Sequence, residues 1–401
     1  MQKLRLAVFN TQPPHLYFGG VERRIMETAK LLGDEVDMTV YCGTKAGLKS
    51  PMRFGGVTIV PCFSTDVAYP LDNWFFNRTI AGAVDTIKAD VYEAHAVSGY
   101  GFLRELRKRK MKKPFIQTVH GVLADEYVKA LEGGAKTPRA KLANYFMGRL
   151  AHMEKTAAQD ATLIVTVSKY SAEKIVQYYN VDRAKIRVAS NGVDTQRFRP
   201  AANREKIRQQ IGVAGRPCVL FVGRLIPRKG LGFLVEAAKQ IVKDFHDAVF
   251  LIVGDGPMRS QLTAYLREIN LLGNFRFLGD VKEQQLPALY NCADVFVLPS
   301  IQEGLGIVLL EAQATAIPVI AFDVGGVAEA ISAGETGLLL KPNSRRLADA
   351  ILKLLSDARL RAKMGTRGRK FVSEHFSWRS CAEKMLQIYR EALAFDADGF
   401  R

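Results

Sequence analysis

The sequence predicts an α/β fold made of two doubly wound domains, each built around a parallel sheet. Short apolar runs alternate with helical segments through the first half of the chain, which is typical of parallel strands connected by helices. The same alternation starts again near residue 219. A length of 401 residues also exceeds the usual size of one hydrophobic core, so two domains are expected.

The first domain is expected to cover residues 1–195. Its first strand, Leu4–Asn10, is an apolar run, and a glycine-bearing loop then leads into a helix at Val21–Leu32. A last strand that starts at Ile186 runs into a turn and ends the domain. Between these, short apolar runs predict strands at Val36–Cys42, Val57–Pro61, Val91–Ala94, Phe115–Val119 and Leu163–Val167.

The second domain is expected to cover residues 196–378, with a linker at 197–203. Its apolar runs predict strands at Val219–Val222, Val249–Val253, Asn274–Leu278, Val295–Leu298, Pro318–Phe322 and Gly337–Leu340. The segments between them predict helices at Leu231–Val242, Met258–Asn270, Glu283–Cys292 and Ile307–Ala314. Residues 379–401 are expected to form a final helix and a tail.

The composition favours a globular protein. Hydrophobic residues make up 48% of the chain, and no apolar run reaches the ~20 residues that a membrane-spanning helix needs. The start of the chain lacks the apolar length and the small-residue cleavage site of a secretory leader, which predicts a cytoplasmic protein. Five scattered cysteines show no zinc-ligand spacing and are expected to be reduced core thiols.

The net charge of +17 is the unusual feature of the composition. Residues 1–200 carry a net charge of +11, and their densest basic segment runs from residue 104 to residue 113. A solvated helix end, an anionic membrane surface and nucleic acid could each explain this segment, but no aromatic platform or nucleic-acid motif supports the last. The candidate membrane-binding cations are Arg104, Arg107, Lys108, Arg109, Lys110, Lys112 and Lys113.

The segment from Ser300 to Glu311 joins two carboxylates to a helix start that follows an apolar strand. Gly304 and Gly306 let a ligand approach the backbone closely, and the unpaired N–H groups of a helix start attract phosphate. On one ideal helix, Glu303 and Glu311 would lie roughly 12 Å apart and about 80° apart around the axis. They should therefore contact different parts of an extended anionic ligand, such as a sugar nucleotide.

The spacing of Glu303 and Glu311 resembles the E-x7-E signature of the retaining glycosyltransferases of family 4, which have the GT-B fold of two Rossmann-like domains. Further segments resemble landmarks of that family and occur in the family's order. They are Gly19-Gly-Val-Glu22, Thr118-Val-His-Gly121, Val167-Ser-Lys-Tyr170, Asn191-Gly-Val-Asp194, Phe221-Val-Gly-Arg224 with Lys229-Gly230, Val253-Gly-Asp-Gly-Pro257, Phe277-Leu-Gly279, Gly325-Gly-Val-Ala-Glu329 and Thr336-Gly337. These segments follow predicted strands, so they are expected to meet at one interdomain cleft.

This resemblance implies a donor site in the second domain. Arg224 and Lys229 would contact the diphosphate, while Arg228 would face solvent. Glu311 would accept hydrogen bonds from ribose hydroxyls and Glu303 from hydroxyls of the transferred sugar. Leu278 lies where the family selects the nucleotide base. The backbone of Gly304, Leu305, Gly306, Ile307 and Val308 would complete the anion site. Without the resemblance, Glu311 reads as a helix-surface residue and Glu303 as a carboxylate favoured by the helix dipole.

The resemblance also implies roles in the first domain, where acceptor binding is expected. Gly19 and Gly20 would bring a helix start towards the donor, although a plain turn explains them as well. His120 resembles the family position near the anomeric carbon, with a hydrogen-bonding role, although a lone histidine at a strand end is usually structural. The other histidines, including His95, are expected to be structural. The final helix would cross back to pack on the first domain.

The implied function is a metal-independent, retaining transfer of a hexose from a UDP- or GDP-linked sugar to an acceptor hydroxyl. The donor is a substrate, and no cofactor, metal or nucleic-acid partner is expected. The basic first half favours a membrane lipid or lipid-linked glycan as acceptor, with peripheral association at the cytoplasmic membrane face. A soluble small molecule or polysaccharide is the alternative acceptor. A non-catalytic binding protein would be expected to have lost one of Arg224, Lys229, Glu303 and Glu311, and all four are present.

Overall fold

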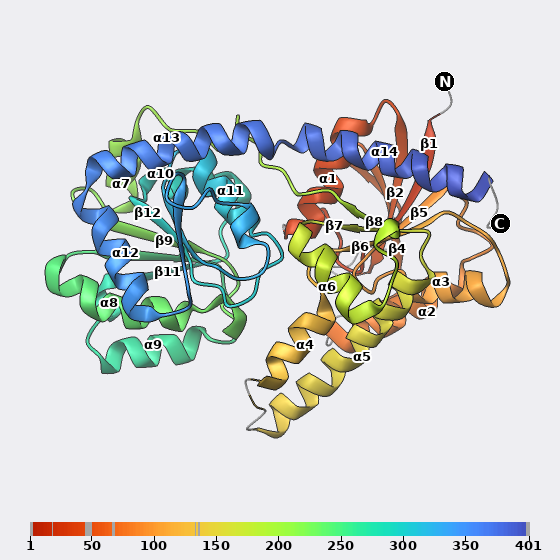
Figure 1. The fold of residues 1–401 in the computed structure, drawn as a ribbon, viewed down its shortest axis with the longest axis horizontal. Coiled ribbons are helices and arrows are strands. Elements are labelled where there is room, and N and C mark those ends of the chain that lie inside the picture. Colours follow the sequence, from red (N-terminus) through yellow and green to blue (C-terminus); the bar gives the residue numbers. More distant parts are fainter. Residues whose placement is uncertain are drawn as a thin grey trace. The chain divides into compact units, whose positions relative to one another are not determined.

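The computed structural model describes residues 3–17, 19–44, 50–65, 69–132, 134 and 137–397. The chain divides into two compact units (Figure 1). Unit 1 comprises Met1–Asn191 with Trp378–Arg401, and unit 2 comprises Gly192–Ser377. The end of the expected tail, residues 398–401, lies outside the described residues. No described helix is both long enough and apolar enough to cross a bilayer.

Unit 1 contains an eight-stranded sheet in the order β3-β4-β2-β1-β5-β6-β7-β8. Every pair of neighbouring strands is parallel except β3 and β4, which are antiparallel. The sequence did not predict β3, because three half-buried or exposed residues at a sheet edge show no apolar alternation. The strands are β1 Leu4–Phe9, β2 Val36–Gly43, β3 Met52–Phe54, β4 Val57–Cys62, β5 Val91–His95, β6 Phe115–Val119, β7 Leu163–Thr166 and β8 Ile186–Val188.

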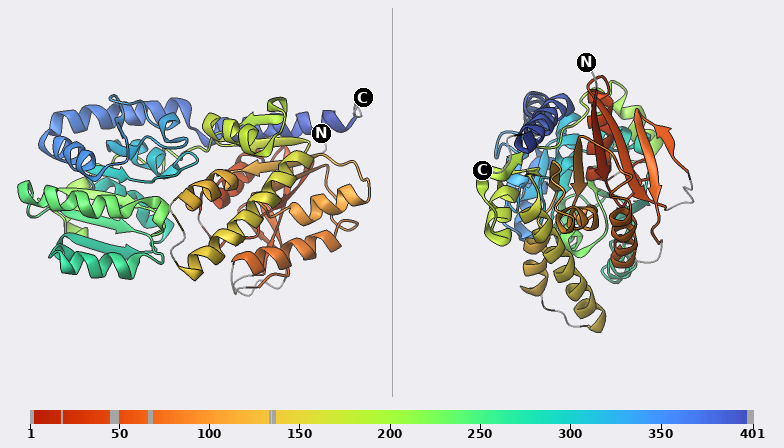
Figure 2. Two further views of the ribbon diagram at one scale, coloured as in Figure 1. Left: turned by 60° about the horizontal axis from the view of Figure 1, so that its bottom comes forward. Right: turned by 90° about the vertical axis from the view of Figure 1, so that its right-hand side faces the viewer.

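Helices pack on this sheet, and two of them extend away from it. Figures 1 and 2 show α4 and α5 as an antiparallel pair that projects from unit 1. The last helix, α14, belongs to unit 1, where it packs along α1 and against β5. The helices of unit 1 are α1 Gly20–Leu32, α2 Tyr69–Gly82, α3 Tyr100–Lys108, α4 Leu123–Glu132, α5 Pro138–Asp160, α6 Lys169–Tyr179 and α14 Trp378–Ala397.

Unit 2 contains a six-stranded, wholly parallel sheet in the order β11-β10-β9-β12-β13-β14. Four of its strands, β9, β10, β12 and β13, are buried along their whole length, which explains their continuous apolar sequences. The strands are β9 Cys218–Val222, β10 Val249–Val253, β11 Phe275–Gly279, β12 Val295–Leu298, β13 Val319–Phe322 and β14 Gly337–Leu340.

The helices of unit 2 cover this sheet. The predicted helix at Ile307–Ala314 is confirmed as α11. Residues 197–203, predicted to be a linker, instead pack within unit 2, where the side chain of Asn291 accepts from the backbone N–H of Ala201 at 2.8 Å. The helices are α7 Arg204–Ile211, α8 Leu231–Asp244, α9 Arg259–Glu268, α10 Leu286–Cys292, α11 Ile307–Ala314, α12 Ser344–Ser356 and α13 Ala358–His375.

The strand orders confirm two doubly wound sheets and fix where each can bind a ligand. In unit 2 the order reverses between β9 and β12, and in unit 1 it reverses between β1 and β5. At such a switch point the loops that follow the two strands diverge and leave a crevice at the carboxyl edge of the sheet. The loops placed to bind a ligand are therefore those after β9 and β12 in unit 2 and after β1 and β5 in unit 1.

A buried carboxyl group at the base of the α4–α5 pair predicts a pH-dependent stability. Glu154 on α5 accepts hydrogen bonds from the Tyr179 hydroxyl and, at 3.0 Å, from the N–H of Leu123, while its Oε1 has no hydrogen-bond partner among the described residues. Burial raises the pKa of Glu154 to about 7. A carboxyl with a raised folded-state pKa stabilises the fold below its unfolded-state pKa, and this stabilisation is lost as pH rises towards 7.

We therefore expect Glu154→Gln to gain stability relative to wild type as the pH rises. Between pH 5 and pH 8 the difference in the free energy of unfolding should move by about 2–3 kcal/mol in favour of the variant. Urea unfolding at the two pH values measures this change. Glu132→Gln, which removes an exposed carboxylate of α4, is the control and should show no such drift. A pH-independent difference for Glu154→Gln would contradict the raised pKa.

Candidate functional site

The loops after β9 and β12 of unit 2 touch each other at Gly230. This residue has a φ of +66°, and a Cβ added to it would lie 1.9 Å from the carbonyl oxygen of Pro299. Only glycine allows both the left-handed backbone and this close approach. The contact brings Lys229, at the end of one loop, next to Glu303 of the other.

Lys229 and Glu303 form a half-buried ion pair, with 2.5 Å between Nζ and Oε2. Ser300 Oγ donates to the same carboxylate oxygen at 3.3 Å. Burial acts to raise the pKa of Glu303, but the charges of Lys229 and Arg228 and the hydrogen bonds from Lys229 and Ser300 outweigh it, so this pKa is lowered. The carboxylate therefore stays ionised at neutral pH. The structure brings together two of the predicted donor-binding residues, and here they bind each other.

The two arginines of this loop differ in exposure, and one prediction is corrected. Arg224, directly after Gly223, is exposed. Arg228 was expected to face solvent, but it is half-buried and its Nη1 lies 3.5 Å from the carbonyl oxygen of Gln302. The backbone explains this position, because the carbonyl of Arg228 accepts from the N–H of Ile301 at 2.9 Å and holds the two loops together.

The helix start beyond Glu303 is open. Gly306, with a φ of +87°, precedes α11, and no side chain caps the helix. Glu303 lies before this helix rather than on it, and its backbone is held by the turn at Gly325, where an added Cβ would lie 2.0 Å from the Glu303 carbonyl oxygen. The first N–H groups of α11 thus lie beside the loop that carries the Lys229–Glu303 pair.

Glu311 is buried, although its expected role needs a carboxylate that a ribose can reach. It lies in the second turn of α11 with 1% of its surface exposed, and its Oε2 accepts from the hydroxyl of Tyr290 at 2.7 Å. The alternative that it is a helix-surface residue is wrong. A ribose hydroxyl can reach this carboxylate only if neighbouring atoms move. Tyr290, on α10, escaped the sequence analysis. Leu278, on β11 at the edge of the sheet, is exposed.

In unit 1, His120 follows β6 and forms a hydrogen bond with His95, the last residue of β5. The His95 Nδ1 and His120 Nε2 atoms are 2.9 Å apart. Because β5 and β6 are parallel neighbours, with His95 opposite Thr118, both histidines reach the carboxyl edge of the sheet. The sequence analysis treated His95 as structural. His95 directly follows a predicted strand, as His120 does, but only the adjacency of β5 and β6 in the sheet pairs the two residues.

A buried polar network supports this histidine pair. Glu93 Oε1 lies 3.6 Å from His95 Nε2 and also accepts from the Thr118 hydroxyl at 2.6 Å. Glu93 Oε2 accepts from the hydroxyl of Tyr389 on α14 at 2.6 Å. The carboxylate near His95 Nε2 favours a proton on that nitrogen. His95 Nδ1 then accepts from His120 Nε2, which leaves His120 Nδ1 as an acceptor.

The environment keeps both imidazoles neutral. Burial lowers the pKa of His95 to about 4, and the charge of Arg24 adds to this effect, although Glu93 opposes it. Burial, His95 and Arg24 also hold the pKa of His120 well below its ordinary value. Arg24 is itself buried and donates to the carbonyl oxygen of Ala189 at 2.7 Å. At neutral pH the pair can exchange hydrogen bonds with a ligand without adding charge.

Gly19 and Gly20 form the start of α1, with Gly19 as its uncapped N-cap residue. The carboxylate of Glu22 already lies close to this helix start, because a Cβ on Gly19 would be 2.5 Å from Glu22 Oε2. Glu22 also accepts from Asn10 Nδ2 at 3.1 Å. Burial raises the pKa of Glu22. The backbone at Gly19 is extended, with a φ of −77°, and the nearest atom is the end of a flexible side chain, so the backbone geometry alone does not require glycine at this position.

The seven candidate membrane-binding cations do not share one surface. Arg104 and Lys108, one helical turn apart on α3, line a large groove with α2 and α5. Arg109 pairs with Glu105 at 2.7 Å and with Asp85 at 2.6 Å. The remaining four line a smaller pocket of about 390 Å³ that also includes Phe395 of α14. They are Arg107, Lys110, Lys112 and Lys113.

Two family models match successive parts of the chain. Residues 18–197 match Glycosyltransferase Family 4, and residues 203–371 match Glycosyl transferases group 1. An uncharacterized glycosyltransferase of Methanocaldococcus jannaschii is 30% identical, and the alignment covers 78% of each chain. The sucrose-phosphate synthase of Thermosynechococcus elongatus has a similar fold, with a TM-score of 0.84, 22% identity and coverage of 98% of this chain and 100% of that one.

A further relative is similar to this chain over part of its length. The GDP-mannose-dependent alpha-(1-6)-phosphatidylinositol monomannoside mannosyltransferase of Mycobacterium tuberculosis is 36% identical over 241 residues, which is 58% of this chain. The match spans 62% of that protein's length, which is less than two thirds.

Proposed function

Because this chain belongs to the family 4 glycosyltransferases and has their GT-B fold, we propose that it transfers a hexose from a nucleoside-diphosphate sugar to an acceptor hydroxyl, with retention of configuration and without a metal. One observation supports this proposal more than any other. The Lys229–Glu303 pair lies next to the open start of α11, so a cation, a carboxylate and unpaired N–H groups converge on one edge of unit 2. That combination fits a sugar attached to a diphosphate.

In the proposed reaction, the leaving diphosphate carries the developing negative charge. Arg224, Lys229 and the N–H groups at the start of α11 stabilise that charge in the transition state. Binding of the donor draws Lys229 from Glu303 towards a phosphate oxygen. The carboxylate of Glu303 is then available to accept a hydrogen bond from a hydroxyl of the transferred sugar. The acceptor hydroxyl attacks the anomeric carbon from the face that the diphosphate leaves, the bond from that carbon to the phosphate oxygen breaks, and the hydroxyl proton passes to the departing diphosphate, which gives retention.

His120 and Glu311 have supporting roles in this proposal. His120, with its Nδ1 lone pair directed by His95, accepts a hydrogen bond from the donor sugar. Glu311 holds the ribose hydroxyls once donor binding exposes it, and Leu278 contacts the base. Gly19 and Gly20 bring the start of α1 to the donor.

The donor is UDP- or GDP-linked, and the acceptor is a membrane lipid or lipid-linked glycan at the membrane surface. The mycobacterial relative supports a GDP-linked donor and a lipid acceptor, because it is a GDP-mannose-dependent phosphatidylinositol monomannoside mannosyltransferase. A soluble or polysaccharide acceptor is the competing outcome.

Thermal denaturation with UDP, GDP, ADP and their sugar conjugates tests the donor. We expect UDP or GDP to raise the melting temperature of wild type by several degrees at saturating concentration, because a ligand stabilises the state that binds it. ADP serves as the matched control. Product analysis by NMR then reports the anomeric configuration, and transfer in the presence of EDTA reports the metal requirement. A flat melting temperature across the whole panel would contradict the proposal.

A further inference from the structure

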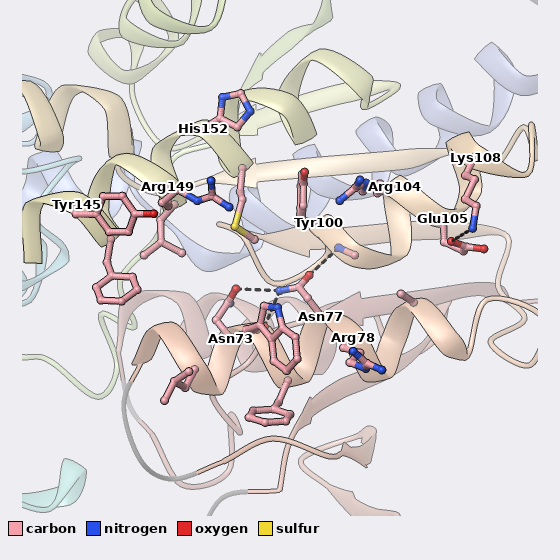
Figure 3. A pocket seen from close by; sticks show the side chains of 18 residues that line it. Asn73, Asn77, Arg78, Tyr100, Arg104, Glu105, Lys108, Tyr145, Arg149 and His152 are labelled. Atoms are coloured by element: carbon pink, nitrogen blue, oxygen red, sulfur yellow. Dashed lines mark hydrogen bonds and ion pairs between the residues drawn. The ribbon is translucent and has the colours of Figure 1, made fainter. Parts of the chain in front are cut away.

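Unit 1 contains a large groove between α2, α3 and α5 (Figure 3). It encloses about 1030 Å³, which is at the upper end of the range for sites that hold small molecules. Figure 3 shows Arg104 and Arg149 on either side of Tyr100, while Asn73 and Asn77 extend from α2 on the opposite wall. No described side chain of the proposed donor site lines this groove.

The apolar side chains of the groove are unusually exposed. Trp74 of α2 is 51% exposed and Tyr145 of α5 is 61% exposed, with Leu71 and Phe146 beside them in the lining. Single exposed apolar residues need no explanation, but a group of them around one concave surface indicates a binding site. Tryptophan and tyrosine are enriched at membrane–water interfaces, where apolar acyl chains meet polar headgroups.

The charged residues of the groove leave a surplus of positive charge. Arg78, Arg104, Lys108 and Arg149 line it, and Glu105 is the one acidic residue in the described lining. Glu105 pairs with Arg109 at 2.7 Å and with Lys108 at 3.9 Å, whereas among the described residues no carboxylate pairs with Arg104 or Arg149. The guanidinium of Arg78 lies over the ring of Trp74, 5.6 Å from its centre. Cations without anionic partners beside an exposed aromatic wall fit an amphipathic anion.

The helix that forms one wall is tied to the edge of the sheet where the histidine pair lies. Asn73 Nδ2 donates to the hydroxyl of Thr11, in the loop after β1, at 3.1 Å. Asn77 Nδ2 donates to the carbonyl oxygen of Val97, beyond β5, at 3.0 Å. These two loops flank the switch point of unit 1, and His95 ends β5. A molecule in the groove can therefore direct its headgroup towards this edge.

We propose that the groove binds an anionic phospholipid, with its acyl chain along Leu71, Trp74 and Phe146 and its phosphate at Arg104 and Arg149. This inference rests on the proposed transferase function, in which such a lipid is the acceptor. Of the seven candidate membrane-binding cations in residues 104–113, Arg104 and Lys108 are the two that line the groove, so the inference limits the lipid-binding role to these two.

Tryptophan fluorescence tests the acyl-chain part directly. The chain contains two tryptophans, and the other, Trp378, is 6% exposed, so lipid insertion should change mainly the emission of Trp74. Vesicles of phosphatidylcholine with phosphatidylglycerol should shift the emission of wild type to shorter wavelength, and brominated acyl chains should quench it. Trp74→Phe should abolish both responses. An unchanged emission with every vesicle would overturn the proposal.

Three further additions identify the ligand chemistry. Vesicles of phosphatidylcholine alone and soluble glycerol phosphate should each leave the emission of Trp74 unchanged, because the first lacks net negative charge and the second lacks a chain. An equal response to neutral vesicles would contradict the requirement for an anionic headgroup. A full response to glycerol phosphate would contradict the requirement for an acyl chain. A response to a soluble oligosaccharide in place of lipid would assign the groove to a different acceptor and also overturn the proposal.

Charge variants separate the groove from a diffuse basic surface. Arg104→Gln with Arg149→Gln should weaken binding to the anionic vesicles by about 20-fold in co-sedimentation. The matched control is Lys112→Gln with Lys141→Gln, which removes the same charge from exposed positions outside the groove lining. Equal losses in both pairs would overturn the groove as the binding site.

The donor experiment on wild type distinguishes failure of this inference from failure of the proposed function. A melting temperature raised by a nucleotide, without a Trp74 response, would refute the lipid groove alone. A Trp74 response without any effect of nucleotides would refute the proposed transferase function and leave the lipid site standing as a binding site.

Discussion

Replacing Arg224 and Lys229 together with alanine is expected to lower the transfer rate about 10³- to 10⁴-fold. In the proposed mechanism these cations stabilise the charge that develops on the leaving diphosphate, and the loss of a single such donor typically costs 10²- to 10³-fold. Steady-state transfer from the nucleotide sugar identified by thermal denaturation measures the effect. Because the stabilisation grows in the transition state, kcat should fall more than the donor affinity.

Two controls show whether such a loss is chemical. Arg228→Ala removes a neighbouring cation that is half-buried against Gln302, and it should retain most of the rate. Lys229→Ala alone leaves Glu303 without its ion pair, so part of its effect will be lower stability. Adding Glu303→Gln removes the unpaired charge and should restore the melting temperature without restoring transfer. If the Arg224 and Lys229 double variant kept the wild-type rate, the proposed donor site would be wrong.

The pattern of apolar residues along the chain predicted the strands that are surrounded by apolar side chains on both faces of the sheet. The strands β9, β10 and β12 are buried on both faces, so their sequences are uninterrupted apolar runs that end at glycine or proline. Helix α11 was predicted to the residue because Gly306 and the change of pattern after it mark its start. The edge strand β3 was missed because its exposed residues carry no such pattern.

Contacts that depend on strand order could not be predicted in the same way. Spacing along the chain gives no reason to pair His95 with His120, and only the adjacency of β5 and β6 places them together. The burial of Glu311 beneath Tyr290 likewise depends on how α10 packs against α11. The division of the basic cations of residues 104–113 between two pockets could be predicted in part. Arg104 and Lys108 are one helical turn apart and therefore share a face of the helix.

The histidine pair supplies the second large effect. His120→Ala should lower transfer about 10²-fold, since a hydrogen bond lost from a buried site typically costs about 1–3 kcal/mol. Glu93 does not contact substrate in the proposed mechanism, and it acts by fixing the tautomer of His95 and, through it, the free acceptor of His120. Glu93→Gln should therefore lower transfer about 10-fold, a smaller loss of the same kind.

The pH dependence of kcat/KM separates this positioning role from simple stability. In wild type, activity should hold as pH falls from 7 to 6, because burial keeps the pKa of both imidazoles low, and it should decline only as the pair protonates near the pKa of about 4 of His95. The charge of Glu93 raises that pKa, so Glu93→Gln should move the acid limb to lower pH. Tyr389→Phe is the matched control, because it removes one hydrogen bond to the carboxylate but leaves its charge, and its acid limb should coincide with that of wild type. Coincident limbs for all three proteins, with full activity in Glu93→Gln, would show that the network serves stability alone.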